Sequence, residues 1–126
     1  MRASISDELL EAINEAIYLD LELHIIEKRM MEAEKKGNKG FAKHLNVLFY
    51  KVSSKRKANK QYLKDNGVKI SDPVDFNDIE NEKAIFIDYH YSQSINGGYK
   101  EGIQRYWKAA LKLNLKKRMN GYFKGG

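Results

Sequence analysis

The first part of the chain carries a helical repeat of apolar positions. Between Leu9 and Ala33, apolar residues recur at alternating steps of three and four, which places them along one face of an α-helix. The row consists of Leu9, Ala12, Ala16, Leu19, Leu23, Ile26, Met30 and Ala33. Ser6 is a suitable N-cap before two acidic residues, and Gly37 follows two lysines as a stop signal. The sequence therefore predicts a long helix over about residues 7–36.

A second helical repeat starts after that glycine. Asn38 is a suitable cap, and the apolar positions at helical spacing are Ala42, Leu45, Phe49 and Val52. Residues 53–60 then read Ser-Ser-Lys-Arg-Lys-Ala-Asn-Lys and offer no large apolar side chain on any face. The apolar pattern resumes briefly before an Asn-Gly pair at residues 66–67 ends it. We expect one helix here, with a middle section that is either solvated all round or in contact with something polar.

Residues 79–95, which follow an Asp-Pro connection, fit two different elements. A helix would place on one face Ile79, Lys83, Phe86, His90 and Ser94. A strand would alternate at Ile85, Ile87, Tyr89 and Tyr91. We assign a helix, because a lone strand has no obvious partner elsewhere in the sequence and a stable sheet needs several strands. The alternative is an α+β fold with a short strand near residues 84–92.

A last helix is expected after the Asn-Gly-Gly turn at residues 96–98. Its broad apolar arc would comprise Ile103, Tyr106, Trp107, Ala110, Leu111, Leu113 and Leu115. Its opposite face would comprise Arg105, Lys108, Lys112 and Lys116. Four such segments predict an all-α fold, an antiparallel four-helix bundle with a long N-terminal helix. Residues 1–126 are expected to form this single helical domain.

The composition narrows the function classes. The chain has 126 residues, of which 42% are hydrophobic and 32% charged, close to the average of a globular domain. It contains no cysteine, which excludes a disulfide framework, a thiolate metal site and a thiol nucleophile. The start lacks the apolar stretch of a signal peptide, and no apolar run is long enough to span a bilayer. We therefore expect a soluble, cytoplasmic protein.

Charge alternates along the chain in four blocks. The formal net charge is +6, from 23 basic and 17 acidic residues. Residues 1–38 carry a net charge of −4, residues 39–71 of +8, residues 72–98 of −5 and residues 99–126 of +7. Either successive elements complement one another electrostatically, or the basic blocks bind a polyanion such as DNA or RNA.

The densest group of cations lies in the second block. The candidate phosphate contacts are Lys51, Lys55, Arg56, Lys57 and Lys60. Four of the five are lysines, which act on phosphates as point charges and would contact the backbone without reading the base sequence. Sequence-independent binding of nucleic acid is therefore the alternative function, and a solvated helix flank is the purely structural explanation.

Signs of other chemistry are sparse. Asp20, His24 and Glu27 share one helical face and have side-chain types that ligate metals, but no Glu-x-x-His pair supports a dinuclear site. His24 also continues a second apolar row of the same helix, which favours a partly buried structural imidazole. The sequence shows neither a Gly-x-Ser-x-Gly turn nor a glycine-rich phosphate loop. We expect no metal, no cofactor and no enzymatic activity.

The length of the first helix points to protein binding. A helix of about thirty residues is longer than so small a bundle requires, and its surplus length can present apolar surface to a partner. The candidate interaction seam is Leu9, Leu19, Leu23, Ile26 and Met30. We expect a small regulatory or adaptor protein that binds another protein or itself, with a homodimer along this helix as one form. Lysine outnumbers arginine 18 to 5 and asparagine reaches ten, a bias that suggests a low-GC bacterium or a phage as the source.

Overall fold

The chain folds into α-helices packed on one side of a three-stranded antiparallel sheet. The computed structural model describes residues 5–72, 74, 79 and 83–122. In chain order the elements are α1 (Asp7–Lys35), α2 (Lys39–Asp65), β1 (Val68–Ile70), β2 (Phe86–Ile95), β3 (Gly98–Trp107) and α4 (Lys108–Met119). Within these residues no helix is both long and apolar enough to cross a membrane.

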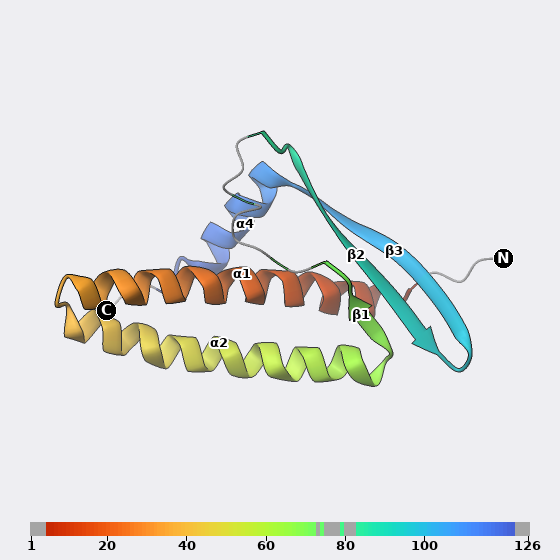
Figure 1. The fold of residues 1–126 in the computed structure, drawn as a ribbon, viewed down its shortest axis with the longest axis horizontal. Coiled ribbons are helices and arrows are strands. Elements are labelled where there is room, and N and C mark those ends of the chain that lie inside the picture. Colours follow the sequence, from red (N-terminus) through yellow and green to blue (C-terminus); the bar gives the residue numbers. More distant parts are fainter. Residues whose placement is uncertain (1–4, 73, 75–78, 80–82, 123–126) are drawn as a thin grey trace.

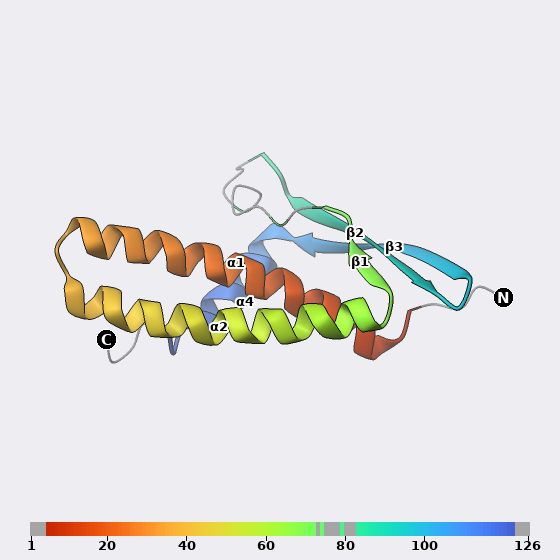
Figure 2. The same ribbon diagram turned by 60° about the horizontal axis from the view of Figure 1, so that its bottom comes forward.

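The two long helices form an antiparallel hairpin and lie side by side along most of their length (Figures 1 and 2). Both predicted caps are present: the Ser6 Oγ accepts from the Leu9 N–H at 3.3 Å, and the Asn38 Oδ1 accepts from the Phe41 N–H at 3.2 Å. Gly37 turns the chain between the helices at φ +71°. The predicted bounds of both helices are therefore confirmed to within a residue or two.

The sheet has the strand order β1-β2-β3. Asn96 and Gly97 connect β2 to β3 with φ of +51° and +78°, the geometry of a two-residue hairpin turn. Gly67 joins α2 to β1 at φ +70°, where an added Cβ would lie 2.0 Å from the Ser94 carbonyl oxygen. Only glycine fits this position, because the backbone conformation and the close approach both exclude a side chain.

The hydrophobic core has two parts. The first lies between α1, the inner face of the sheet and α4, and it includes the fully buried Ile13, Ile17 and Leu111. The second lies between the distal halves of α1 and α2 and is closed by Met119 of α4. Each long helix therefore uses its apolar row inside the molecule, where burial contributes most to stability.

Three tyrosines join the sheet to α1. The Tyr106 ring packs edge-on against Tyr18 and Tyr89, with centroid distances of 5.9 and 6.0 Å. Its hydroxyl donates to the Asn14 Oδ1 at 2.5 Å, so the polar end of the buried ring is satisfied. Burial raises the pKa of the Tyr106 hydroxyl above its usual range.

The structure corrects the predicted all-α four-helix bundle. Residues 86–95 form β2 and not a helix, and the fold is α+β, as in the alternative with a strand near residues 84–92. The assignment failed because β2 does have a partner, the segment from Gly98 to Trp107. The side chains of that segment at Ile103, Tyr106 and Trp107 also satisfy helical spacing, so its alternation was hidden.

The last helix is correspondingly shorter than predicted. It begins at Lys108, so Arg105, Tyr106 and Trp107 belong to a strand. The helical face of Leu111 and Leu115, buried against α1, was identified correctly. Within the described residues, an up-down-up-down arrangement of four long helices is absent, and a twisted hairpin takes the place of the third one (Figure 1).

Candidate functional site

The strand register gives the sheet an inner and an outer face. Side chains alternate between faces along a strand, and Ile87, Tyr89 and Tyr106 point to the core. The cross-strand pairs on the opposite side are Phe86 with Trp107, Asp88 with Arg105, His90 with Ile103, Ser92 with Glu101, and Ser94 with Tyr99. We call these ten residues the outer face. They lie away from α1 and carry the largest group of exposed aromatic and aliphatic side chains on the described part of the chain.

Apolar side chains of the outer face are exposed to an unusual degree. The exposed fractions are 56% for Phe86, 59% for Trp107, 52% for Ile103 and 63% for Tyr99. Ile85, next to Phe86, is 64% exposed. Single exposed apolar residues are common, but several on one strand pair mark an interaction surface.

Ion pairs between these apolar residues neutralise the outer face. The Arg105 guanidinium donates to both Asp88 carboxylate oxygens at 2.7 and 2.9 Å, and it lies 5.5 Å from the centre of the Phe86 ring. The Asp72 carboxylate accepts from the His90 backbone N–H at 2.6 Å and contacts the His90 Nδ1 at 2.7 Å. These contacts leave the outer face without a strong net charge, which suits a polypeptide partner more than a polyanion.

The same contacts shift the ionisation of the carboxyl groups. The backbone N–H of His90 lowers the pKa of Asp72, and the Arg105 guanidinium lowers the pKa of Asp88. The Tyr99 hydroxyl donates to the Glu101 Oε1 at 2.8 Å, and this hydrogen bond raises the pKa of Tyr99. Asp88 on the outer face and Asp72 beside it are therefore stabilised in their ionised forms.

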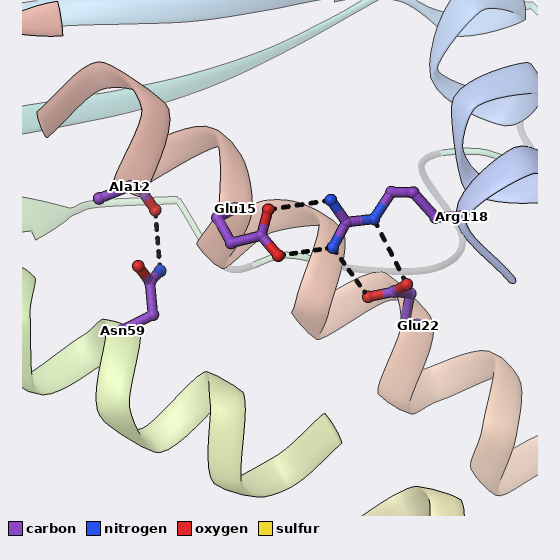
Figure 3. A network of polar contacts seen from close by, with 5 residues as sticks. All are labelled: Ala12, Glu15, Glu22, Asn59 and Arg118. Atoms are coloured by element: carbon purple, nitrogen blue, oxygen red, sulfur yellow. Dashed lines mark hydrogen bonds and ion pairs between the residues drawn. The ribbon is translucent and has the colours of Figure 1, made fainter. Parts of the chain in front are cut away.

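A polar network anchors the end of β3 to the helices. Arg118 of α4 lies between two carboxylates of α1, Glu15 at 2.7 and 2.9 Å and the fully buried Glu22 at 3.2 and 3.3 Å (Figure 3). Its guanidinium also lies 4.9 Å from the centre of the Tyr18 ring. Because α4 follows β3 without a loop, this network holds the helix that continues the hairpin against α1.

A groove of about 700 Å³ lies between α1, α2 and β1. Asp20, His24 and Glu27 line its α1 wall, and Arg56 and Lys60 line its α2 wall. The Arg56 Nε donates to the Asp20 Oδ1 across the groove. His24 is exposed, which corrects the prediction of a partly buried imidazole. Among the described residues, no group of three or more acidic or histidine side chains is arranged to hold a metal ion.

The structure distributes the five predicted phosphate contacts over two flanks of α2. Arg56 and Lys60 line the groove, whereas Lys55 lies near Glu15 on the other flank, where its charge contributes to a lowered Glu15 pKa. Lys51 lies one helical turn from Lys55, and Lys57 is exposed. The five cations are therefore not brought together on one face.

The predicted interaction seam of α1 lies largely inside the molecule. Leu9, Leu19 and Ile26 are buried, and Leu23 and Met30 pack partly buried against the second core cluster. Intramolecular contacts with α2, α4 and the sheet therefore occupy these positions. The outer face was missed because residues 98–107 were assigned to a helix. A signal for it is the Asn-Gly pair at residues 96–97, which follows the alternating positions Ile85, Ile87, Tyr89 and Tyr91.

Comparison with known proteins places the chain in a family. The chain matches the family described as YhjD protein over residues 4–126, nearly its whole length. No curated protein and no solved structure matches the chain.

Proposed function

Since the chain belongs to the YhjD protein family, whose name states no activity, we propose its function from the geometry: a small, non-enzymatic adaptor or regulatory protein that binds another protein. The observation that carries the proposal is the outer face. Four large apolar side chains stand exposed there on a sheet that the core holds rigid from the other side. Rigid, partly apolar and charge-balanced surfaces are the usual basis of protein recognition.

The partner is a protein that buries Phe86 and Trp107 at the open end of the hairpin. These two residues are directly opposite each other, and Ile85 extends the apolar area beside them. Aromatic residues in such a position are typical anchors of an interface. The Asp88–Arg105 pair borders the anchors and would form the polar rim.

Affinity capture with matched variants tests this proposal. Phe86→Ser removes one anchor from β2, and Tyr50→Ser removes an equally exposed aromatic ring from α2. We expect a specific protein to be recovered from an extract of the source organism with the wild-type chain and with Tyr50→Ser, and at least tenfold less of it with Phe86→Ser. Binding of the purified partner to the three chains should give the same order. Equal recovery with all three chains would contradict a role for the outer face.

The second candidate is binding of a nucleic-acid backbone by α2. It is favoured by the exposure of Lys51, Lys57 and Lys60, which belong to the block of net charge +8. Against it, Arg56 is engaged by Asp20. A salt titration of binding to mixed DNA and RNA oligomers tests it: replacing those three lysines by alanine should reduce the logarithmic salt slope by about two to three units. Replacing Lys112, Lys116 and Lys117 of α4 is the control, and absence of binding at low salt would exclude this function.

A further inference from the structure

Strand β3 forms one edge of the sheet and offers unpaired backbone groups. The Lys108 N–H donates to the Ile85 carbonyl at 2.8 Å, which identifies this pair as hydrogen-bonded. Since hydrogen-bonded and non-hydrogen-bonded pairs alternate in antiparallel strands, the even-numbered residues of β3 bond to β2. The backbone N–H and C=O groups that point away from β2 belong to Tyr99, Glu101, Ile103, Arg105 and Trp107. The Trp107 C=O is the exception, because Trp107 is the N-cap of α4 and its carbonyl accepts the first hydrogen bond of that helix. Outside the helices and the sheet ladder, the described ranges show no backbone hydrogen bond to the other groups.

This edge is long and accessible. β3 has ten residues without a proline, and it is the outermost strand, with β2, β1 and the long helices all on its other side (Figure 1). Proteins usually protect such edges with proline, bulges, short strands or covering segments. The described part of the chain uses none of these four devices along β3. Charged side chains also protect edges, and β3 carries Lys100, Glu101 and Arg105. The edge is therefore a template for a strand whose charges are complementary to its own.

The outward residues of β3 form a self-complementary sequence. Read from either end, the series is aromatic, charged, aliphatic, charged, aromatic: Tyr99, Glu101, Ile103, Arg105 and Trp107. The two charges have opposite sign and lie at equal distances from Ile103 along the chain. A second, antiparallel copy of the strand would therefore place Glu101 opposite Arg105, Tyr99 opposite Trp107 and Ile103 opposite itself.

We propose that two copies of the chain pair through their β3 edges, with a two-fold axis at Ile103, to form a continuous six-stranded sheet. The inference deepens the proposed function, because pairing would join the outer faces of both copies into one larger surface for the partner. In this arrangement the outward backbone N–H and C=O groups of Glu101, Ile103 and Arg105 all meet outward groups of the second copy. The Trp107 N–H meets the Tyr99 carbonyl, while the Trp107 carbonyl stays in the first turn of α4. Symmetric pairing of one strand with itself is closed and does not continue into a fibre.

The charges also select this register over its neighbours. A two-fold axis at Glu101 would place Glu101 opposite its own copy, and an axis at Arg105 would do the same for the arginine. Like charges directly opposite each other destabilise a strand pair. Axes at Gly102 or Gln104 would place each charge opposite an apolar or aromatic side chain. Among these axes only the one at Ile103 pairs opposite charges.

Charge reversal of single residues tests the pairing. Glu101→Lys gives a strand with two cations, and Arg105→Glu gives a strand with two anions, so each variant repels its own copy. Mixing them restores complementary pairs on both sides of the axis. In sedimentation equilibrium we expect twice the 14.6 kDa chain mass for the wild type, a monomer for each variant alone, and a heterodimer in the equimolar mixture.

A backbone variant separates edge pairing from effects of side-chain charge. The Ile103 N–H points away from β2, so Ile103→Pro removes a donor for the second copy and leaves the hairpin ladder in place. We expect Ile103→Pro to be a monomer with an unchanged circular dichroism spectrum and Ile103→Val to be a dimer. Any one of three results would overturn the proposal: the wild-type chain stays monomeric at millimolar concentration, the mixture of charge-reversed variants does not associate, or Ile103→Pro is a dimer.

The two proposals fail in different ways. Phe86 lies on β2 and not at the edge, so Phe86→Ser should remain a dimer while losing the partner. If the wild type captures its partner as a monomer, only the pairing of β3 edges is wrong. If it dimerises and Phe86→Ser captures the same proteins equally well, only the adaptor function of the outer face is wrong.

Discussion

At the scale of single residues, Arg118 joins α4 to α1 through an ion pair with a buried carboxylate. It compensates Glu22, which is fully buried, and it also binds Glu15. Removing one partner of a buried ion pair leaves an uncompensated charge in a medium of low polarity. Loss of Arg118 would therefore destabilise α1, which carries Glu22, as well as α4.

We expect Arg118→Ala to lower the free energy of unfolding by about 3 to 5 kcal/mol. Chemical denaturation followed by circular dichroism measures this change. Lys117→Ala, on the exposed side of the same helix, should change the value by less than about 0.5 kcal/mol. The double variant Glu22→Gln/Arg118→Ala should be more stable than Arg118→Ala alone, and the opposite order would contradict this account of Glu22.

Alanine substitutions at Gly67 and Gly37 separate the energetic cost of backbone strain from the cost of a close atomic contact. Both have φ near +70°, but an added Cβ at Gly67 would meet the Ser94 carbonyl, whereas nothing lies within 4 Å of the one at Gly37. Gly37→Ala should therefore cost about 1 kcal/mol from backbone strain alone. Gly67→Ala should cost roughly 1 to 3 kcal/mol more, because β1 must move away from β2. Equal losses in thermal or chemical denaturation would show that the close approach is relieved cheaply.

At the scale of elements, α4 supports two different parts of the molecule. Leu111 belongs to the core beneath the sheet, and Met119 closes the core between the distal halves of α1 and α2. Truncating either side chain should cost about 2 to 5 kcal/mol by leaving a cavity. The two cavities should loosen different segments.

Hydrogen exchange distinguishes these segments. Met119→Ala should accelerate amide exchange in residues 26–52 with little change in β2 and β3, and Leu111→Ala should accelerate exchange in the hairpin. Acceleration of the same amides in both variants would show that the two cores open as one unit.

The sequence predicts the long helices clearly, whereas for the hairpin it offers weaker signals, the alternation at residues 85–91 and the Asn-Gly pair at residues 96–97. The row from Leu9 to Ala33 repeats over many turns, so helical spacing is distinguishable from chance. β3 carries exposed aromatic residues on its outer side, so its apolar pattern is not a simple alternation and also fits a helix. The outer face consists of residues from two strands, so it exists only where β2 and β3 pair, and neither segment alone indicates it.

At the scale of the whole molecule, the four charge blocks contact one another. Asp20 binds Arg56, Glu15 and Glu22 bind Arg118, and Asp88 binds Arg105, and each of these ion pairs joins an acidic block to a basic one. Complementarity between elements therefore accounts for much of the alternation.

These contacts predict how stability depends on pH. The hydrogen bond from Arg118 lowers the pKa of Glu15 below its ordinary value of 4.5. The contribution of ionised Glu15 to the free energy of unfolding is therefore complete above that pH. The contribution is lost as the pH falls through the lowered pKa. The free energy of unfolding of the wild type should decrease below pH 4.5, and that of Glu15→Gln should decrease less. Parallel curves for the two chains would exclude Glu15 as the group responsible.

The Arg118 network also has a consequence for the order of synthesis. Glu22 leaves the ribosome 96 residues before Arg118, a delay of about 5 to 20 s at ordinary rates of translation. During that interval the α1–α2 hairpin cannot bury Glu22 beside its counter-ion, and the apolar row of α1 lacks the cover that α4 provides. The helical hairpin of the nascent chain therefore stays incomplete until the last helix emerges and supplies both the counter-ion and the apolar cover.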